Sequence, residues 1–341
     1  MEHLLQSRPR LWATKAANGA ELQGWEMPKR VPLPSALQGR AFLFRDARQM
    51  PLGAGRLRGM DLERPFRGVR VANGAGTTEI DVLLERCATY APLLVPGRFF
   101  SHLTATRLWG APLPRDFDPG ESLHVSTVAP GIAPRMVGIV GHQSSHSLSE
   151  LGSRHGFATS GPESTWLSLG DLLPLDELVV IGDYLVLDPV VLNPIDVRPF
   201  TTIERLAASL ASFHGRGARS LARALPLIRS GAESRPETLL RLLIVRGGLP
   251  EPEANIAVTD TQGRELGRGD LVYSRWRTVV EYDGDGHRTN TRQYERDIHR
   301  LESFRDARWH VVQVRSRGLF VTPQQTIARI TAALRQGGWP G

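Results

Sequence analysis

The chain contains little cysteine, almost no lysine and no long run of apolar residues. Cys87 is the one cysteine among 341 residues, which excludes an internal disulfide and a cysteine-rich zinc site. Lys15 and Lys29 are the only lysines, so all but two of the 42 basic residues are arginine. Beyond residue 29, chemistry that depends on a lysine amine is therefore excluded.

No apolar segment reaches the roughly 18 residues that a membrane-spanning helix requires. The longest candidate, Leu178 to Leu192, is interrupted by Asp183 and Asp188. The N-terminus lacks a basic start followed by an apolar core, as a secretory signal would have. We therefore expect a cytoplasmic protein without a membrane partner.

The charge balance points to a polyanionic partner. A net charge of +7 and an isoelectric point near 10.2 suit DNA, although many basic proteins bind no nucleic acid. Between residues 40 and 70 there are eight arginines and three acids, the densest basic stretch of the chain. This stretch is the first candidate for a nucleic-acid contact.

The length of the chain is sufficient for two or three domains with cores of their own. We expect an irregular N-terminal arm (1–38), a small basic module (39–95), an α+β middle domain with a helical linker (96–232) and a C-terminal α/β domain (233–341). In the basic module, Phe42 to Met50 and Gly53 to Met60 are predicted as helices around Pro51, followed by a β-wing at Arg64 to Val71.

The middle domain carries no chemistry that its sequence reveals. Helices are predicted at 79–90, 101–109, 172–187 and, as a pair, within 201–230; strands are predicted at 123–128 and 135–141. His142, His146 and His155 raise the question of zinc, but they lie among serine and glycine without carboxylates or cysteines. We therefore do not expect a metal there.

The C-terminal segment begins with a helix start and continues as a hairpin. Ser234 and Glu237 have the spacing of a capping box ahead of an apolar helix. Strands are expected at 255–258, 269–273 and 278–282, with polar turns at 261–263 and 274–277.

Hairpin register decides where the acidic residues point. A turn centred between Arg275 and Trp276 places Asp270 opposite Glu281, and the strand period puts Asp283 on the same face. Converging carboxylates repel each other unless a cation lies between them, and hard oxygen ligands suit Mg²⁺ or Mn²⁺. Two alternatives stay open: a register shifted by one residue, or a surface salt-bridge network with Arg268 opposite Asp283.

The same residues resemble the core of the PD-(D/E)XK nuclease superfamily, in the branch similar to very-short-patch-repair endonucleases. The resemblance covers about 85 residues, and the motifs that carry it are Asp270, Val280–His287, Glu295–Asp297 with Arg300 and Leu301, and Trp309–Val312. It implies a restriction-endonuclease-like mixed sheet flanked by helices, one of them running from Arg292 to Arg305.

The resemblance also implies roles for individual residues. Asp270 and Glu281 would hold Mg²⁺ or Mn²⁺, and Glu237 would complete the shell, unless it serves only as the capping partner of Ser234. Asp283 stands where the superfamily usually has a lysine, so His287 becomes the candidate to activate water or protonate the leaving oxygen. Arginines that follow the site would contact phosphates or simply form a solvated helix face: Arg288, Arg292, Arg296 and Arg300.

The basic module resembles the winged helix-turn-helix at the front of AbiEi-type antitoxins, in Phe44 to Arg58 and Asp61 to Val69. This resemblance implies DNA contacts by Arg45, Arg48, Arg56, Arg58, Arg64 and Arg67. We predict a metal-dependent DNA endonuclease or nickase delivered to DNA by this module. The alternative is a catalytically silent DNA-binding regulator or antitoxin, and a homodimer is compatible with either.

Overall fold

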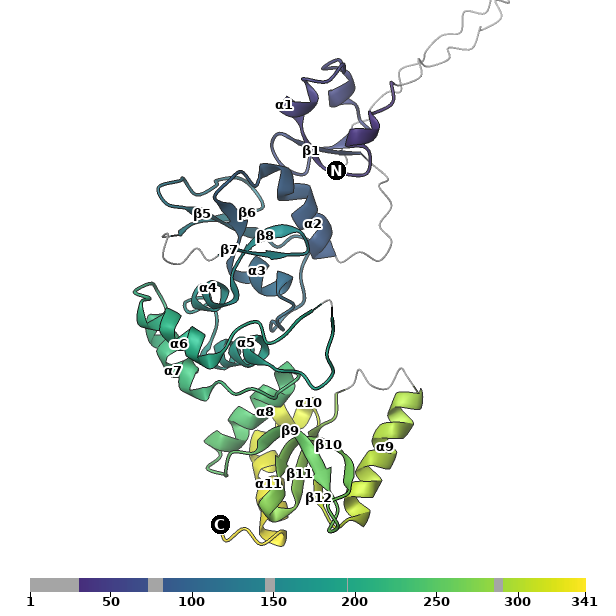
Figure 1. Cartoon of the computed structure of the whole chain (residues 1–341), viewed down its shortest axis with the longest axis vertical. Coiled ribbons are helices and arrows are strands. Elements are labelled where there is room, and N and C mark those ends of the chain that lie inside the picture. The colour runs from purple at the N-terminus through teal and green to yellow at the C-terminus, as the bar shows by residue number, and fades with distance from the viewer. Residues whose placement is uncertain (1–30, 73–81, 145–150, 195, 285–290) are drawn as a thin grey trace, which may run out of the picture.

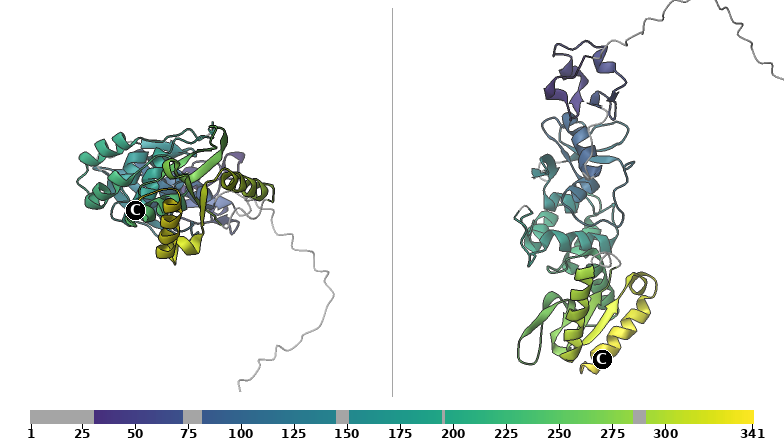
Figure 2. Two further views of the ribbon diagram at one scale, coloured as in Figure 1. Left: turned by 90° about the horizontal axis from the view of Figure 1, so that it is seen from below. Right: turned by 90° about the vertical axis from the view of Figure 1, so that its right-hand side faces the viewer.

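The computed structural model describes residues 31–72, 82–144, 151–194, 196–284 and 291–341. These residues form an elongated α/β structure with the N-terminal module at one end and the C-terminal sheet at the other (Figures 1 and 2). Three separate sheets have three, four and five strands. Among the described helices, none has the length and apolar character to cross a membrane.

The N-terminal module is built around a small antiparallel sheet rather than two helices. Strand β3 (Val69–Ala72) pairs with β1 (Phe42–Leu43) on one side and β2 (Leu62–Glu63) on the other. The predicted helix Phe42–Met50 is reduced to α1 (Phe44–Ala47), and Gly53–Met60 contains only the 3-10 turn η2 (Arg56–Arg58). A further 3-10 turn, η1, covers Ser35–Leu37.

The predicted helices are shortened because apolar side chains of this segment are buried in an extended conformation. Phe42 and Leu43 are both buried, and they reach the core as extended residues paired with Arg70 and Val69. Helix η2 contributes Leu57 to the same small core. The predicted wing survives as the β2–β3 hairpin, whose strands flank the loop at 64–68.

A five-stranded mixed sheet forms the middle of the molecule in the order β6-β5-β4-β8-β7. The strands are β4 (Arg98–Phe100), β5 (Leu123–Val128), β6 (Ile139–Ser144), β7 (Leu151–Arg154) and β8 (Phe157–Ser160). Strand β5 has the predicted bounds, whereas β6 begins later than predicted because Gly138, in the left-handed region at φ 79°, turns the chain first.

Helices accompany this sheet and continue below it as a helical layer. Helix α2 (Val82–Tyr90), the 3-10 turn η3 (Ala91–Leu93), α3 (His102–Leu108) and α4 (Pro162–Leu167) belong to the sheet region. The helical layer contains α5 (Leu175–Val186), α6 (Ile203–Ala211), α7 (Ala218–Ala224) and the 3-10 turn η5 (Leu225–Leu227). Its core gathers around the fully buried Trp166 and the apolar face of α5.

The C-terminal domain has a four-stranded sheet in the order β12-β11-β10-β9. Its strands are β9 (Glu253–Thr259), β10 (Glu265–Tyr273), β11 (Thr278–Tyr282) and β12 (His310–Val314), and the 3-10 turn η6 (Ser274–Trp276) joins β10 to β11. Strands β11 and β12 are parallel, and α9 (Thr291–Asp306) connects them. Helices α8 (Arg235–Arg246), α10 (Ser316–Phe320) and α11 (Pro323–Gln336) complete the domain.

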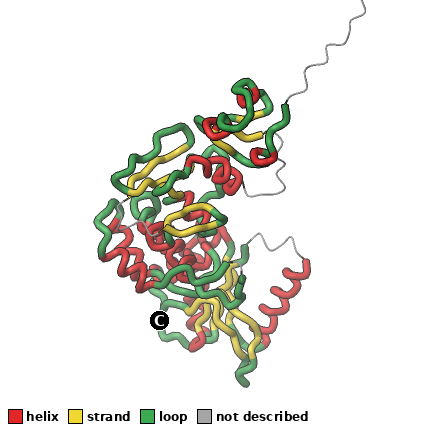
Figure 3. The backbone as a smooth tube through the Cα atoms, turned by 45° about the horizontal axis from the view of Figure 1, so that its top comes forward, coloured by secondary structure: helices red, strands yellow, loops and turns green. Residues whose placement is uncertain are grey.

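Helices cover both faces of this sheet, as Figure 3 shows in red against the yellow strands. Leu271 and Val280 pack with residues of α8 and α11, whereas Val272 and Val279 pack with Leu301 and other residues of α9. Successive residues of a strand point to opposite faces, so a pair at 270 and 281 belongs to the face that α9 covers.

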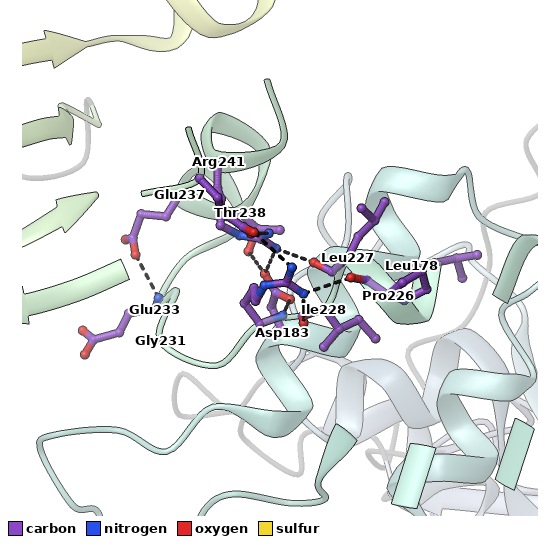
Figure 4. A network of polar contacts seen from close by, with 12 residues as sticks. Leu178, Asp183, Pro226, Leu227, Ile228, Gly231, Glu233, Glu237, Thr238 and Arg241 are labelled. Atoms are coloured by element: carbon purple, nitrogen blue, oxygen red, sulfur yellow. Dashed lines mark hydrogen bonds and ion pairs between the residues drawn. The ribbon is translucent and has the colours of Figure 1, made fainter. Parts of the chain in front are cut away.

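A buried polar network joins the helical layer to the C-terminal domain (Figure 4). Arg241 of α8 and Asp183 of α5 are both almost fully buried and form an ion pair of 2.8 Å. Asp183 also accepts hydrogen bonds from the Thr238 hydroxyl and the Arg229 backbone N–H. Leu242 packs in the helical layer while Leu240 packs against the sheet, so α8 belongs to both cores.

Candidate metal-binding carboxylate site

The hairpin of β10 and β11 brings Asp270 and Glu281 together as the sequence predicted. Tyr273 pairs with Thr278, Val272 with Val279 and Leu271 with Val280, which is the predicted register. The Asp270 backbone N–H donates to Glu281 Oε1 at 3.2 Å. The Asp270 carboxylate accepts from the Tyr282 N–H at 2.7 Å. A register shifted by one residue is thereby excluded.

A cavity of about 760 Å³ opens beside these carboxylates. Its charged lining consists of six acids and four arginines: Glu233, Glu237, Asp270, Glu281, Asp283, Asp297, Arg268, Arg300, Arg305 and Arg315. The four carboxylates predicted as site residues thus lie around one cavity. His287 and Arg288 fall outside the described residues, as does the side chain of Arg292.

The electrostatics of the site favour a proton or another cation between the acids. Burial, reinforced by the charges of Glu281 and Glu237, raises the pKa of Asp270 well above its ordinary value. Burial also raises the pKa of Glu281, although Arg300 opposes this shift. Within the described ranges, no basic side chain makes an ion pair with Asp270.

Glu237 serves as a capping residue and also lines the cavity. The Ser234 side chain accepts the Glu237 N–H, and Glu237 Oε1 accepts the Ser234 hydroxyl at 2.7 Å. Glu237 Oε2 accepts the Glu233 N–H, visible in Figure 4, and an N–H of the Asn255 amide. The capping interpretation is confirmed, and these bonds engage both oxygens of the carboxylate.

The alternative of a salt bridge between Arg268 and Asp283, which the sequence left open, does not occur. Arg268 instead pairs with Glu233 and bonds to the side chain of Asn255. Asp283 pairs at 2.8 Å with Arg315, the residue that directly follows β12. Arg315, which follows the parallel neighbour β12, therefore takes up the charge of Asp283, and the network through Arg268 does not form. Glu281 is nevertheless part of an ion-pair network, with Arg300 and Asp297 of α9.

Arg300 lies inside the site instead of extending toward solvent. One Nη of Arg300 pairs with Glu281 Oε2 at 2.9 Å, and the other donates to the carbonyl of Arg268 at 2.6 Å. Arg296, also on α9, is exposed. Phosphate contact by these two arginines stays a prediction, but Arg300 already neutralises part of the charge of Glu281.

In the N-terminal module, the predicted DNA-contacting arginines are mostly at the surface. Arg45, Arg48, Arg58, Arg64 and Arg67 are exposed. Arg56 is half-buried and pairs with Asp61. Burial and the neighbouring charges of Arg64 and Arg58 lower the pKa of Arg70, which places these three guanidinium groups in one basic patch. Arg70 was not among the predicted contacts.

Sequence reasoning missed a cluster of three histidines in the middle of the molecule. His102, His124 and His142 each offer a ring nitrogen, and these atoms lie within 4.8 Å of one another. Of the described residues, no other three His, Cys, Asp or Glu side chains meet this closely; Glu237, Asp270 and Glu281 do not. His155, weighed for zinc from the sequence, is exposed and apart from the cluster, and His146 lies outside the described residues.

Comparison of the chain with protein-family models, with curated proteins and with solved structures gives no match in any of the three. The carboxylate site must therefore be interpreted from its own geometry.

Proposed function

We propose that the C-terminal domain is a divalent-metal-dependent nuclease acting on DNA, with Asp270 and Glu281 as metal ligands. The observation that carries this proposal is the reciprocal contact of the two acids across β10 and β11, in a cavity rimmed by arginines. A buried carboxylate is costly unless a cation or a proton compensates its charge. Asp270 has no basic ion-pair partner among the described residues, so it suits a metal position.

The residues around the cavity fit the charge of a phosphodiester. A bound Mg²⁺ or Mn²⁺ would neutralise the phosphate and lower the pKa of a coordinated water. Asp270 and Glu281 would hold the ion, and Glu237 adds negative charge nearby while its oxygens serve the helix cap. Arg268, Arg305 and Arg315 line the same cavity, where they would bind the phosphates that flank the reacting one.

The described residues of the cavity do not supply an evident general base. Asp283 stands in place of the usual lysine and is engaged by Arg315. His287 remains the proposed base from the sequence, outside the described residues.

A second function is favoured by the ion pair between Arg300 and Glu281. A guanidinium on one of two metal ligands supplies a positive charge without a metal. In this alternative the domain is catalytically silent, and the chain is a DNA-binding regulator that uses the basic patch of the N-terminal module.

A supercoiled-plasmid assay with the full chain separates the two functions. We expect Mg²⁺- or Mn²⁺-dependent nicking by the wild type, lost in Asp270→Asn. The matched control is Asp306→Asn, which makes the same change at an exposed residue of α9 outside the cavity and should leave nicking intact. DNA binding without cleavage under either metal would support the regulator. Nicking that survives in Asp270→Asn would exclude the proposed site.

A further inference from the structure

The three histidines converge because their strands are neighbours in the middle sheet. Strand β5 carries His124, its parallel neighbour β6 carries His142, and His102 follows the end of β4 on the other side of β5. Ser126 pairs with His142, so His124, two residues earlier, shares a face with both. His124 Nδ1 and His142 Nε2 are 3.0 Å apart, within hydrogen-bond distance, and the rings of His102 and His142 stack with centroids at 3.6 Å. A shared ion would replace this hydrogen bond and would require one of the two stacked rings to rotate, because the lone pair of an imidazole nitrogen lies in the plane of its ring.

The backbone at His102 is held in an unusual conformation. His102 has φ 50°, in the left-handed region that residues other than glycine rarely adopt. Such strain persists where the surrounding structure requires it, and it is common at ligand sites. Here it turns the His102 ring toward His124 and His142 at the first residue of α3. The Ser101 N–H donates to the His124 carbonyl and fixes this approach.

The hydrogen bonds around His102 fit a ligand whose other nitrogen is held by a neighbour. His102 Nδ1 lies 2.9 Å from the Ser101 hydroxyl, which in turn accepts from the Ser126 hydroxyl at 2.8 Å. When Nδ1 donates to Ser101, Nε2 keeps its lone pair for a metal, as in most histidine–metal sites.

Burial of the three rings disfavours their charged forms. Burial, together with the other histidines, lowers the pKa of His102 to about 3 and that of His124 to about 4. Burial also lowers the pKa of His142, against the opposing charge of Asp171.

We propose that His102, His124 and His142 bind a zinc ion in the middle domain. Imidazole nitrogens suit zinc, and a tetrahedral ion with Zn–N of 2.0–2.1 Å places ligand nitrogens roughly 3.3 Å apart. The 3.0 Å between His124 and His142 is close to this value. Three protein ligands leave the fourth position for a water or a substrate oxygen, as in catalytic zinc sites.

A cavity of about 320 Å³ borders the cluster and gives this fourth ligand room. Its lining includes His102, Ser101, Ser126 and the carboxylate-bearing Asp171. These two cavities among the described residues would then take different metals. Carboxylates line the one in the C-terminal domain, and the other adjoins nitrogen ligands, so each site can be emptied by substitution without touching the other.

The test uses the full chain carrying Asp270→Asn, so that the carboxylate site cannot contribute. After removal of bound metal by a chelator, the protein is titrated with Co²⁺ as a spectroscopic probe and then with Zn²⁺. We expect one equivalent of Zn²⁺ that displaces Co²⁺, and at least a tenfold loss of affinity in His142→Gln. The control His155→Gln changes an exposed histidine outside the cluster and should retain the full equivalent.

Two results would overturn the proposal: no tight Zn²⁺ binding by the parent protein, or equal binding by His142→Gln. Because His142→Gln could also unfold the domain, X-ray absorption of the Zn²⁺-loaded parent gives an independent measure. Three imidazole ligands are expected, and a shell of oxygen ligands alone would refute the site. Neither measurement depends on plasmid nicking, so the zinc site and the nuclease can fail separately.

Discussion

Replacement of Asp270 by asparagine should make the metal-free protein more stable at neutral pH. The amide keeps the shape of the side chain and can still accept the Tyr282 N–H. What it removes is a negative charge beside Glu281 and Glu237. Burial, reinforced by the charges of these two acids, raises the pKa of Asp270 above its ordinary value of 3.8. Folding of the wild type therefore takes up a proton, or tolerates the repulsion where no proton is available.

The size of the effect follows from the separation of the two acids. Opposite side chains on neighbouring strands have Cβ atoms about 5 Å apart, and two unit charges at that distance repel by about 3 kcal/mol at an effective dielectric constant of about 20. Arg300 cancels part of the charge on Glu281. We therefore expect Asp270→Asn to stabilise the C-terminal domain by about 1–2 kcal/mol, or roughly 3–8 °C in melting temperature.

The stability gained by Asp270→Asn should depend on pH in a defined way. A carboxyl whose folded pKa lies above its unfolded value binds more protons when folded, so wild-type stability falls as pH rises from about 4 through the raised value. Thermal melts of both proteins in chelator, at about pH 5 and about pH 8, test this dependence. The gain from Asp270→Asn should be large at the higher pH and shrink at the lower. A variant less stable than the wild type at high pH would refute the reasoning.

Three further predictions concern other arginine and carboxylate contacts. Arg241→Met should cost about 3–5 kcal/mol in urea unfolding, because it leaves the buried Asp183 unpaired, and the double change Asp183→Leu/Arg241→Met should recover part of the loss. Arg300→Gln should lower the Kd for Mn²⁺ in calorimetry, because it removes a cation that competes for Glu281; weaker binding would contradict this. The triple change Arg58→Gln/Arg64→Gln/Arg67→Gln should reduce the slope of the logarithm of the DNA-binding constant against the logarithm of the salt concentration by up to roughly 2.7. An unchanged slope would show that these three arginines make no phosphate contacts.

The hairpin could be predicted because its information is local. A polar turn at 274–277 sets the register, and the alternation of Leu271, Val272, Val279 and Val280 fixes the faces. The spacing of Ser234 and Glu237 likewise predicts the helix cap from four consecutive residues. The contact of Arg300 with Glu281 was not accessible in this way, since it depends on how α9 crosses the sheet between β11 and β12.

The N-terminal module and the histidine cluster could not be predicted from the sequence, because both depend on pairing between residues that are far apart along the chain. Phe42 and Leu43 look helical beside Arg45 to Ala47, and only their pairing with β3 makes them extended. The three histidines have no common spacing motif, and they meet because β4, β5 and β6 are adjacent in an order that the sequence does not state. Part of a sequence signal did exist, because His124 and Ser126 alternate with Leu123 and Val125 along β5 and so form a polar stripe on one face of the strand.

The ion pairs give the many arginines of the chain a structural role as well as a proposed role in binding a polyanion. Arg235, Arg241 and Arg246 of α8 pair with acids of α5, Arg300 pairs with Glu281 and Arg315 with Asp283. These arginines compensate carboxylates of the fold, so the net charge of +7 by itself says little about a polyanionic partner. The inference of DNA binding has to depend on the exposed arginines of the N-terminal module and on Arg305, which is exposed and lines the carboxylate cavity. Many acids of this chain pair with an arginine, whereas the half-buried Asp270 has no such partner among the described residues, so it is the position where a cation from solution is expected.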